Sequence, residues 1–120
     1  MSNEKTCSKK FKVDKNIAPV VDWLNSIEGV YTMYSCAGHP EDGDTDSYIS
    51  FIISCMHQKP IDIYETILLK LKNVDVELLC FHFLSEPTKK VNDTNIVYNR
   101  LMTIRLPIMT ARLAKRFKNV

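Results

Sequence analysis

The hydrophobic positions of this chain follow a helical period first and an alternating period afterwards. The first stripe has aliphatic members at three- and four-residue spacing, and these are Ile17, Val20, Val21, Leu24 and Ile27. Such spacing is typical of an amphipathic helix with one buried face. We expect Asn16 to cap this helix, Pro19 to lie in its first turn and Gly29 to end it.

Two alternating segments follow the first helix. Residues 30–35 and 48–56 read as strands, joined by a polar loop over 36–47. In the second strand, Ile49, Phe51 and Ile53 share a face with Cys55 and His57, while the other face is semi-polar. We therefore expect a half-buried hairpin.

The rest of the chain repeats this change of period. The predicted elements are a helix from Pro60 with the stripe Tyr64, Ile67, Leu68 and Leu71, a strand over 74–84, a strand over 96–106, and a basic helix over 108–118 with Ile108, Leu113 and Phe117 inward. A weaker strand is expected over 9–13.

This order of elements indicates an α+β fold. We expect a mixed, mostly antiparallel sheet of four to five strands, with two or three helices mainly on one face. With a strand over 9–13 the plan is ferredoxin-like, βαββαβ, with a C-terminal strand–helix extension. Without that strand it is an open mixed sheet. At 120 residues and 45% hydrophobic, the chain fits one domain over 9–120 after a disordered lead over 1–8.

Composition narrows the cellular setting. No apolar run approaches the roughly 20 residues that a membrane-spanning helix needs, so no membrane partner is expected. The N-terminal residues lack the apolar stretch of a secretory signal. We therefore expect a cytoplasmic protein whose four cysteines are free thiols.

The small net charge of +2 hides an uneven distribution. Residues 1–15 carry five lysines against two acids, and the C-terminal part holds the densest basic set: Arg100, Arg105, Arg112, Lys115, Arg116 and Lys118. Basic ends around an acidic centre permit contact with a phosphate backbone. Plain solvated tails are the alternative, because no aromatic residues are interleaved with the basic ones.

The segment from Ser35 to His39 is the main candidate for chemistry. A thiolate at Cys36 would be a nucleophile, and His39 would carry protons beside it. Gly38 suits a tight turn whose N–H groups bind an anion, with Ser35 as a further donor. The alternative is a strand end in which Cys36 packs in the core and His39 lies on the surface.

Metal binding by the other polar clusters is the least favoured expectation, and a zinc-stabilised fold stays an alternative. The acidic loop over 41–46 begins like a calcium loop but lacks its glycine and its final glutamate. The pairs Cys55/His57 and Cys80/His82 lie on aliphatic faces, where a free cysteine commonly fills the core. In a ferredoxin-like order their strands are separated, so they would not meet.

Residues 32–57 resemble the third wybutosine-synthesising protein family. That family has a Ser-Ser-Cys-Ser/Ala-Gly-Arg segment followed by a strand ending in Ser-His, and this chain has Tyr34-Ser35-Cys36-Ala37-Gly38-His39 and then Ser54-Cys55-Met56-His57. The resemblance implies an S-adenosylmethionine-dependent methyltransferase acting on tRNA. Ser35, Cys36 and Gly38 would match its signature loop, and His57 would match the later histidine. Small phage-type proteins with a Ser-Cys-x-Gly-His segment are similar to the same stretch.

These observations lead to two expectations of function. The first is binding of an anionic ligand, a nucleotide or RNA, at the loop of residues 35–39. Its catalytic candidates are Cys36 and His39, its ligand-binding candidates are Ser35, Gly38 and His57, and S-adenosylmethionine is its cofactor by resemblance. Whether the protein is an enzyme stays open. The second is a non-enzymatic interaction module, a homodimer through an exposed sheet edge.

Overall fold

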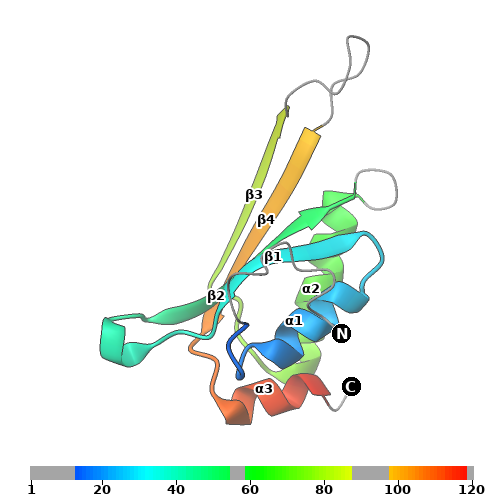
Figure 1. Cartoon of the computed structure of the whole chain (residues 1–120). Helices are drawn as coiled ribbons and strands as arrows, with labels where there is room; N and C mark the ends of the chain where they lie inside the picture. Colours follow the sequence, from blue (N-terminus) through cyan, green and yellow to red (C-terminus); the bar gives the residue numbers. More distant parts are fainter. Residues whose placement is uncertain (1–12, 55–58, 88–97, 119–120) are drawn as a thin grey trace.

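The computed structural model describes residues 13–54, 59–87 and 98–118 of the chain. Three α-helices, one short 3₁₀ helix and four strands alternate along these residues (Figure 1). In chain order they are α1 (Ala18–Ser26), β1 (Val30–Cys36), η2 (Pro40–Asp42), β2 (Asp46–Ile53), α2 (Pro60–Val74), β3 (Cys80–Pro87), β4 (Tyr98–Pro107) and α3 (Ala111–Lys118). The α+β prediction is confirmed.

The sheet has the strand order β1-β2-β4-β3, and every neighbouring pair is antiparallel. The last strand of the chain is therefore central rather than an extension at the edge. It takes the place that the first strand has in a ferredoxin-like plan. Of the strand expected over 9–13, residues 9–12 lie outside the described residues, and Val13 is in no strand.

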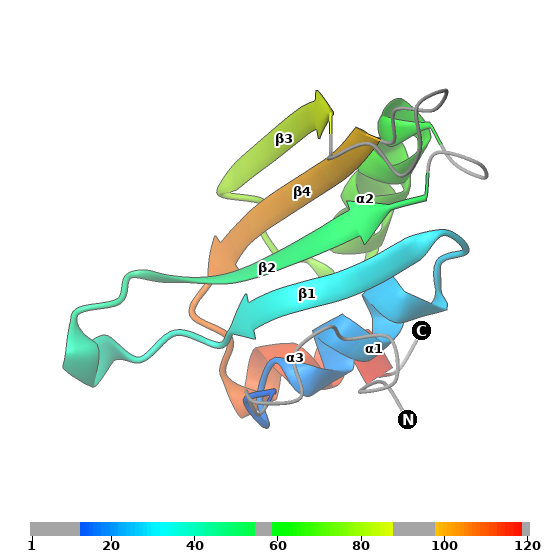
Figure 2. The ribbon, with the colours of Figure 1, turned by 45° about the horizontal axis from the view of Figure 1, so that its top comes forward.

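All three helices cover the same side of the sheet (Figures 1 and 2). The core lies between these two layers. It consists of the inward stripe of α1, the alternate residues of the strands that face the helices, and the inward side chains of α2 and α3. Phe51, Ile49 and Ile104 are among its largest buried strand residues. The opposite side of the sheet carries no described helix.

The stripe predicted for α1 is confirmed, because Ile17, Val20, Val21 and Leu24 are buried and Ile27 packs against them. The cap is different. The helix begins after Ile17, whose side chain makes no capping hydrogen bond, so Asn16 is not the N-cap. The first turn instead uses Pro19, whose fixed φ suits it.

The buried stripe of α2 differs from the prediction. It consists of Ile63, Ile67, Leu71 and Val74, whereas Leu68 is exposed. The helix runs through Val74 and ends at Asp75, which has φ 57°. The strand expected over 74–84 therefore begins only at Cys80. Aliphatic alternation continued across a helix end and a connection, so the sequence pattern did not mark the boundary.

One consequence concerns the pair Cys80/His82. Both side chains are exposed on the helix-free side, so the prediction that Cys80 fills the core is wrong. Cys55 and His57 lie outside the described residues. No helix within the described ranges is long and apolar enough to cross a bilayer.

Candidate functional site

The segment from Ser35 to His39 ends β1 and turns into the loop that carries η2. Ser35 pairs with Ile49 on the helix side of the sheet, whereas Cys36 pairs with Tyr48 on the open side. Gly38 has φ 93°, as the predicted tight turn requires. A side chain at this position would meet Ile108 and the backbone carbonyl of Asp46, which lies only 2.7 Å from an added Cβ.

The N–H groups of this turn are bound by the chain's own acceptors. Ala37 N donates to Asp14 Oδ2 at 3.0 Å, Gly38 N to Cys36 Sγ at 3.4 Å, and His39 N to Asp44 Oδ2 at 2.8 Å. Successive free N–H groups are what make a turn bind anions. Because all three N–H groups already donate hydrogen bonds within the chain, the turn has no free donor among them for an anion.

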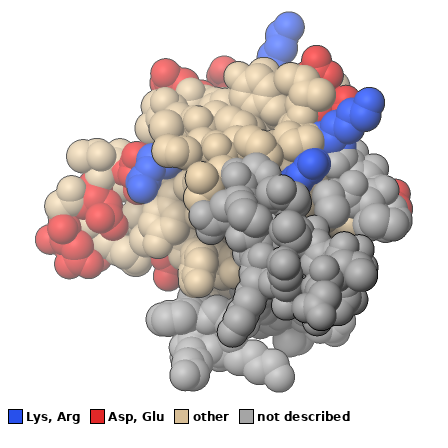
Figure 3. Space-filling model, turned by 90° about the horizontal axis from the view of Figure 1, so that it is seen from above, with Lys and Arg blue, Asp and Glu red and all other residues tan. Residues whose placement is uncertain are grey.

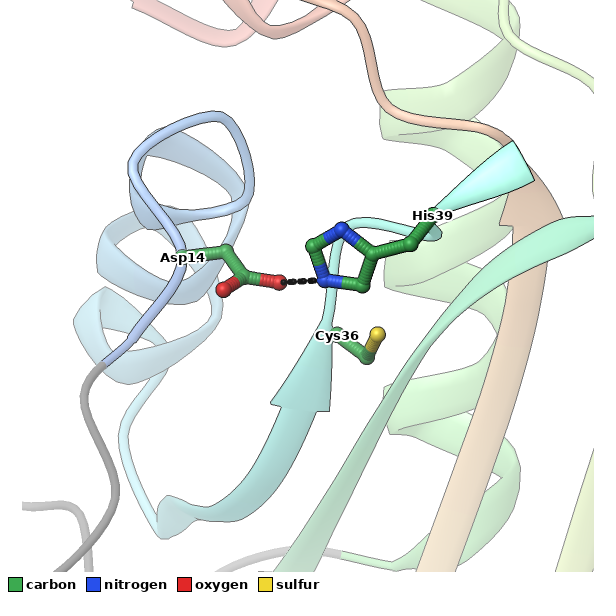
Figure 4. Close-up of side chains that lie close together, drawn as sticks. All are labelled: Asp14, Cys36 and His39. Atoms are coloured by element: carbon green, nitrogen blue, oxygen red, sulfur yellow. Dashed lines mark ion pairs between the residues drawn. The ribbon is translucent and has the colours of Figure 1, made fainter. Parts of the chain in front are cut away.

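Asp14 is the member of this site that the sequence did not reveal. Its Oδ2 lies 3.2 Å from His39 Nε2 (Figure 4). On the other side of the ring, Glu41 Oε2 lies 3.7 Å from His39 Nδ1. Asp14 precedes α1 and is 23 residues from Ala37, and it belongs to no recognisable motif. Only the packing of α1 beside β1 brings it to the turn.

Asp14, Cys36 and His39 bring one donor atom each to a common point. A carboxylate oxygen, the Cys36 sulfur and an imidazole nitrogen all lie within 4.8 Å of one another. A nucleophile–base–orienter arrangement needs one imidazole nitrogen on the thiol and the other on the carboxylate. Here both ring nitrogens of His39 lie near carboxylates, Nε2 near Asp14 and Nδ1 near Glu41. Neither nitrogen is therefore left to take the proton of the Cys36 thiol, and the arrangement is not that of a catalytic triad.

The other predicted site residues do not join this cluster. Cys80 and His82 lie on β3, at the opposite edge of the sheet from β1. His57 lies outside the described residues, so its expected role stays a prediction. Ser35 is half-buried on the helix side.

A second candidate surface is the helix-free side of the sheet, whose residues form three rows across the four strands. We call it the tyrosine face. Its rows, in the order β1, β2, β4, β3, are Cys36–Tyr48–Arg105–Cys80, Tyr34–Ser50–Thr103–His82 and Tyr31–Ile52–Leu101–Leu84. Directly paired residues point to the same side of a sheet, so these side chains share one surface.

The tyrosine face combines exposed rings with polar groups. Tyr31 and Tyr34 are 45% and 51% exposed. The Arg105 guanidinium lies 5.3 Å from the centre of the Tyr48 ring, and it also pairs with Asp46 at 3.1 Å. Such a ring–guanidinium pair is a flat, cationic surface.

A hollow of about 310 Å³ lies on the same face between β3 and β4. It is lined by Cys80, His82, Leu84, Leu101, Thr103 and Arg105. In the view of Figure 3, acidic side chains gather at the end formed by the η2 loop, next to a broad surface with few charges.

Comparisons of the chain with family models, curated proteins and solved structures found no match. The resemblance to the wybutosine-synthesising family therefore stays a prediction. The candidate surfaces are assessed on their geometry alone.

Proposed function

We propose that this protein binds a nucleotide or single-stranded RNA on the tyrosine face, beside the loop of residues 35–39. The observation that carries the proposal is the open four-stranded sheet with exposed tyrosine rings and the Tyr48–Arg105 pair. Four-stranded sheets with aromatic residues on an open face are a common platform for unstacked bases.

Stacking would provide most of the binding energy. Each base stacked on an aromatic ring contributes about 1–3 kcal/mol to binding of single strands. Tyr34 and Tyr31 offer exposed rings on β1, and Tyr48 lies in the next strand. These rings are exposed to water in the free protein. Covering their apolar surface with a base removes it from water, which favours binding.

In the middle row of the face, Thr103 and His82 can contact base edges, whereas Ser50 is buried. The hydroxyl groups of Ser50 and Thr103 share a hydrogen bond of 2.8 Å, and His82 is exposed beside Thr103. Hydroxyl and imidazole groups both donate and accept hydrogen bonds, as base edges require. A purely aliphatic face would lack this complementarity.

The charges on this side imply a particular mode of binding. Arg105 is the cation of the three rows, and Asp46 partly neutralises it. The acids of the η2 loop, Glu41, Asp42 and Asp44, would repel a phosphate backbone that ran over them. We therefore expect stacking to dominate and affinity to fall only slightly with salt, at roughly 0.7 logarithmic steps per phosphate contact.

The test is fluorescence anisotropy with labelled single-stranded RNA of about ten nucleotides, long enough for one small domain. Tyr34→Leu and Tyr48→Leu should each weaken binding about 5- to 150-fold, the equivalent of one stacked base. Leu69→Ala is the control, because Leu69 is 61% exposed on α2, on the helix side.

Equal affinity of the two tyrosine variants and the wild type would refute the proposal. So would a steep salt dependence that is lost in Lys115→Gln, since this would place the contact on α3. S-adenosylmethionine, the cofactor that the resemblance implies, should be added to the same titration. Competition with RNA would place it on the tyrosine face.

A further inference from the structure

We infer that Asp14, Cys36 and His39 form a binding site for one zinc-type divalent transition metal, with a fourth position open to solvent. The site would tie the segment before α1 to the end of β1 and the start of η2. Cys36 also belongs to the tyrosine face. The inference does not depend on RNA binding, because the three donors would hold a metal whether or not RNA is bound.

The kinds of donor atom select the metal. A thiolate, an imidazole and a carboxylate together suit Zn²⁺, which accepts sulfur, nitrogen and oxygen ligands in tetrahedral geometry. Calcium and magnesium prefer oxygen ligands throughout. The sulfur of Cys36 and the ring of His39 therefore argue for a zinc-type ion.

The distances are close to those of a tetrahedral site. With bonds of about 2.0–2.1 Å to oxygen and nitrogen, two such ligands lie about 3.3 Å apart. Asp14 Oδ2 and His39 Nε2 are 3.2 Å apart. A zinc-bound sulfur lies about 3.5 Å from the other ligands. The Cys36 sulfur lies within 4.8 Å of a carboxylate oxygen of Asp14 and a ring nitrogen of His39, so it has to move closer when a metal binds.

The backbone already holds these donors in place. Ala37 N binds the same Asp14 oxygen, and Gly38 N points at the Cys36 sulfur. His39 is held through its own N–H by Asp44, and Glu41 lies near its second ring nitrogen. Metal-binding histidines commonly have a carboxylate at the second nitrogen, which orients the ring. Because these contacts already hold the donors in place, little order has to be imposed on them when a metal binds, and this favours binding.

The site is also accessible. The side chains of His39 and Asp14 are 40% and 33% exposed, so an ion can enter without unfolding the chain. Three protein ligands leave a tetrahedral ion one position for water or an anion. The nearby acids of the η2 loop raise the local cation concentration.

The experiment uses the full chain after removal of bound metal with a chelator. Competition with a chromophoric chelator should show one equivalent of Zn²⁺ per chain, and Co²⁺ should give a thiolate-to-metal charge-transfer band. Cys36→Ser and His39→Gln should each lower the Zn²⁺ affinity at least about 100-fold, because loss of an outer partner alone costs 10- to 100-fold. Asp14→Asn should lower it while an amide oxygen still accepts from Ala37.

Two control variants separate this site from the other two Cys–His pairs. Cys80→Ser changes an exposed thiol at the opposite sheet edge, and Cys55→Ser changes the cysteine of the neighbouring Cys–His pair in the sequence. Both should keep wild-type affinity. The inference is overturned if the wild type binds no zinc, if Cys36→Ser binds it unchanged, or if only Cys55→Ser loses it. Circular dichroism of each variant verifies its fold.

Discussion

Single residues at the end of β1 determine what the turn can hold. Gly38 lets the backbone approach β2 so closely that Asp46 and Ile108 leave no room for a side chain. This approach brings the Ala37 carbonyl to Met109 N, which donates to it at 2.8 Å. Gly38 thereby allows the turn to bind the segment before α3. Its role is to leave room for this contact, since it has no side chain.

Gly38→Ala should lower the free energy of unfolding by about 2–4 kcal/mol, because strain at positive φ adds to a clash with backbone. Gly43→Ala is the matched control. Gly43 has φ 90° but nothing within 4 Å of an added Cβ, so it should lose only about 1–2 kcal/mol. Urea unfolding measures both. Equal losses would mean that the close approach does not matter.

At the scale of elements, α3 stabilises the end of α2. Its Arg116 donates from Nη1 to the carbonyl oxygens of Val74 and Asp75, at 3.3 and 2.8 Å. These carbonyls have no partner within a helix, and a cation near them complements the helix dipole. Phe117 packs against Trp23 of α1, with ring centres 5.7 Å apart. One member of the basic set that suggested RNA contact therefore has a structural role.

Arg116→Gln should lower the free energy of unfolding by about 1–2 kcal/mol, since charge-assisted hydrogen bonds to two carbonyls are lost. Arg112→Gln removes the same charge from an exposed position of the same helix and should change stability by less than about 0.5 kcal/mol. Thermal and urea unfolding of both variants give the comparison. A loss of equal size in the two would point to the overall charge of α3.

At the scale of the whole molecule, the three described α-helices lie on one side of the sheet, and no described helix covers the tyrosine face on the other. An open face suits either a ligand or a second copy of the chain. Stable interfaces between copies have an apolar centre, whereas the central row here is Tyr34, Ser50, Thr103 and His82. This composition favours a ligand over self-association through the face. The homodimer through an exposed sheet edge, the second expectation, stays a prediction.

We expect the tyrosine face not to pair with a second copy and the free chain to be a monomer. Its melting temperature should not change over about a hundredfold range of protein concentration, because dimers gain stability by mass action. Sedimentation at the highest concentration provides the second measurement. A melting temperature that rises with concentration, and stops rising in Tyr34→Leu, would assign the face to self-association.

Local pattern predicted most elements well and their arrangement poorly. The stripe of α1 and the alternation of β1 and β2 are visible in the sequence because burial of one face needs a fixed period. The predicted start of β3 at residue 74 is too early. Val74 at the end of α2 and Val76 in the connection are both buried, and their spacing continues the alternation of the strand. Nothing local indicates that β4 lies between β2 and β3.

The sequence by itself determined the kinds of element, their order and the turn with Cys36, Gly38 and His39. These follow from interactions between residues close in the chain. The tertiary structure decided which strands are neighbours, which side of the sheet stays open, and that Asp14 lies 3.2 Å from His39. Such contacts depend on how whole elements pack together. The period of the hydrophobic residues shows which face of an element is buried, but it does not show which other element covers that face.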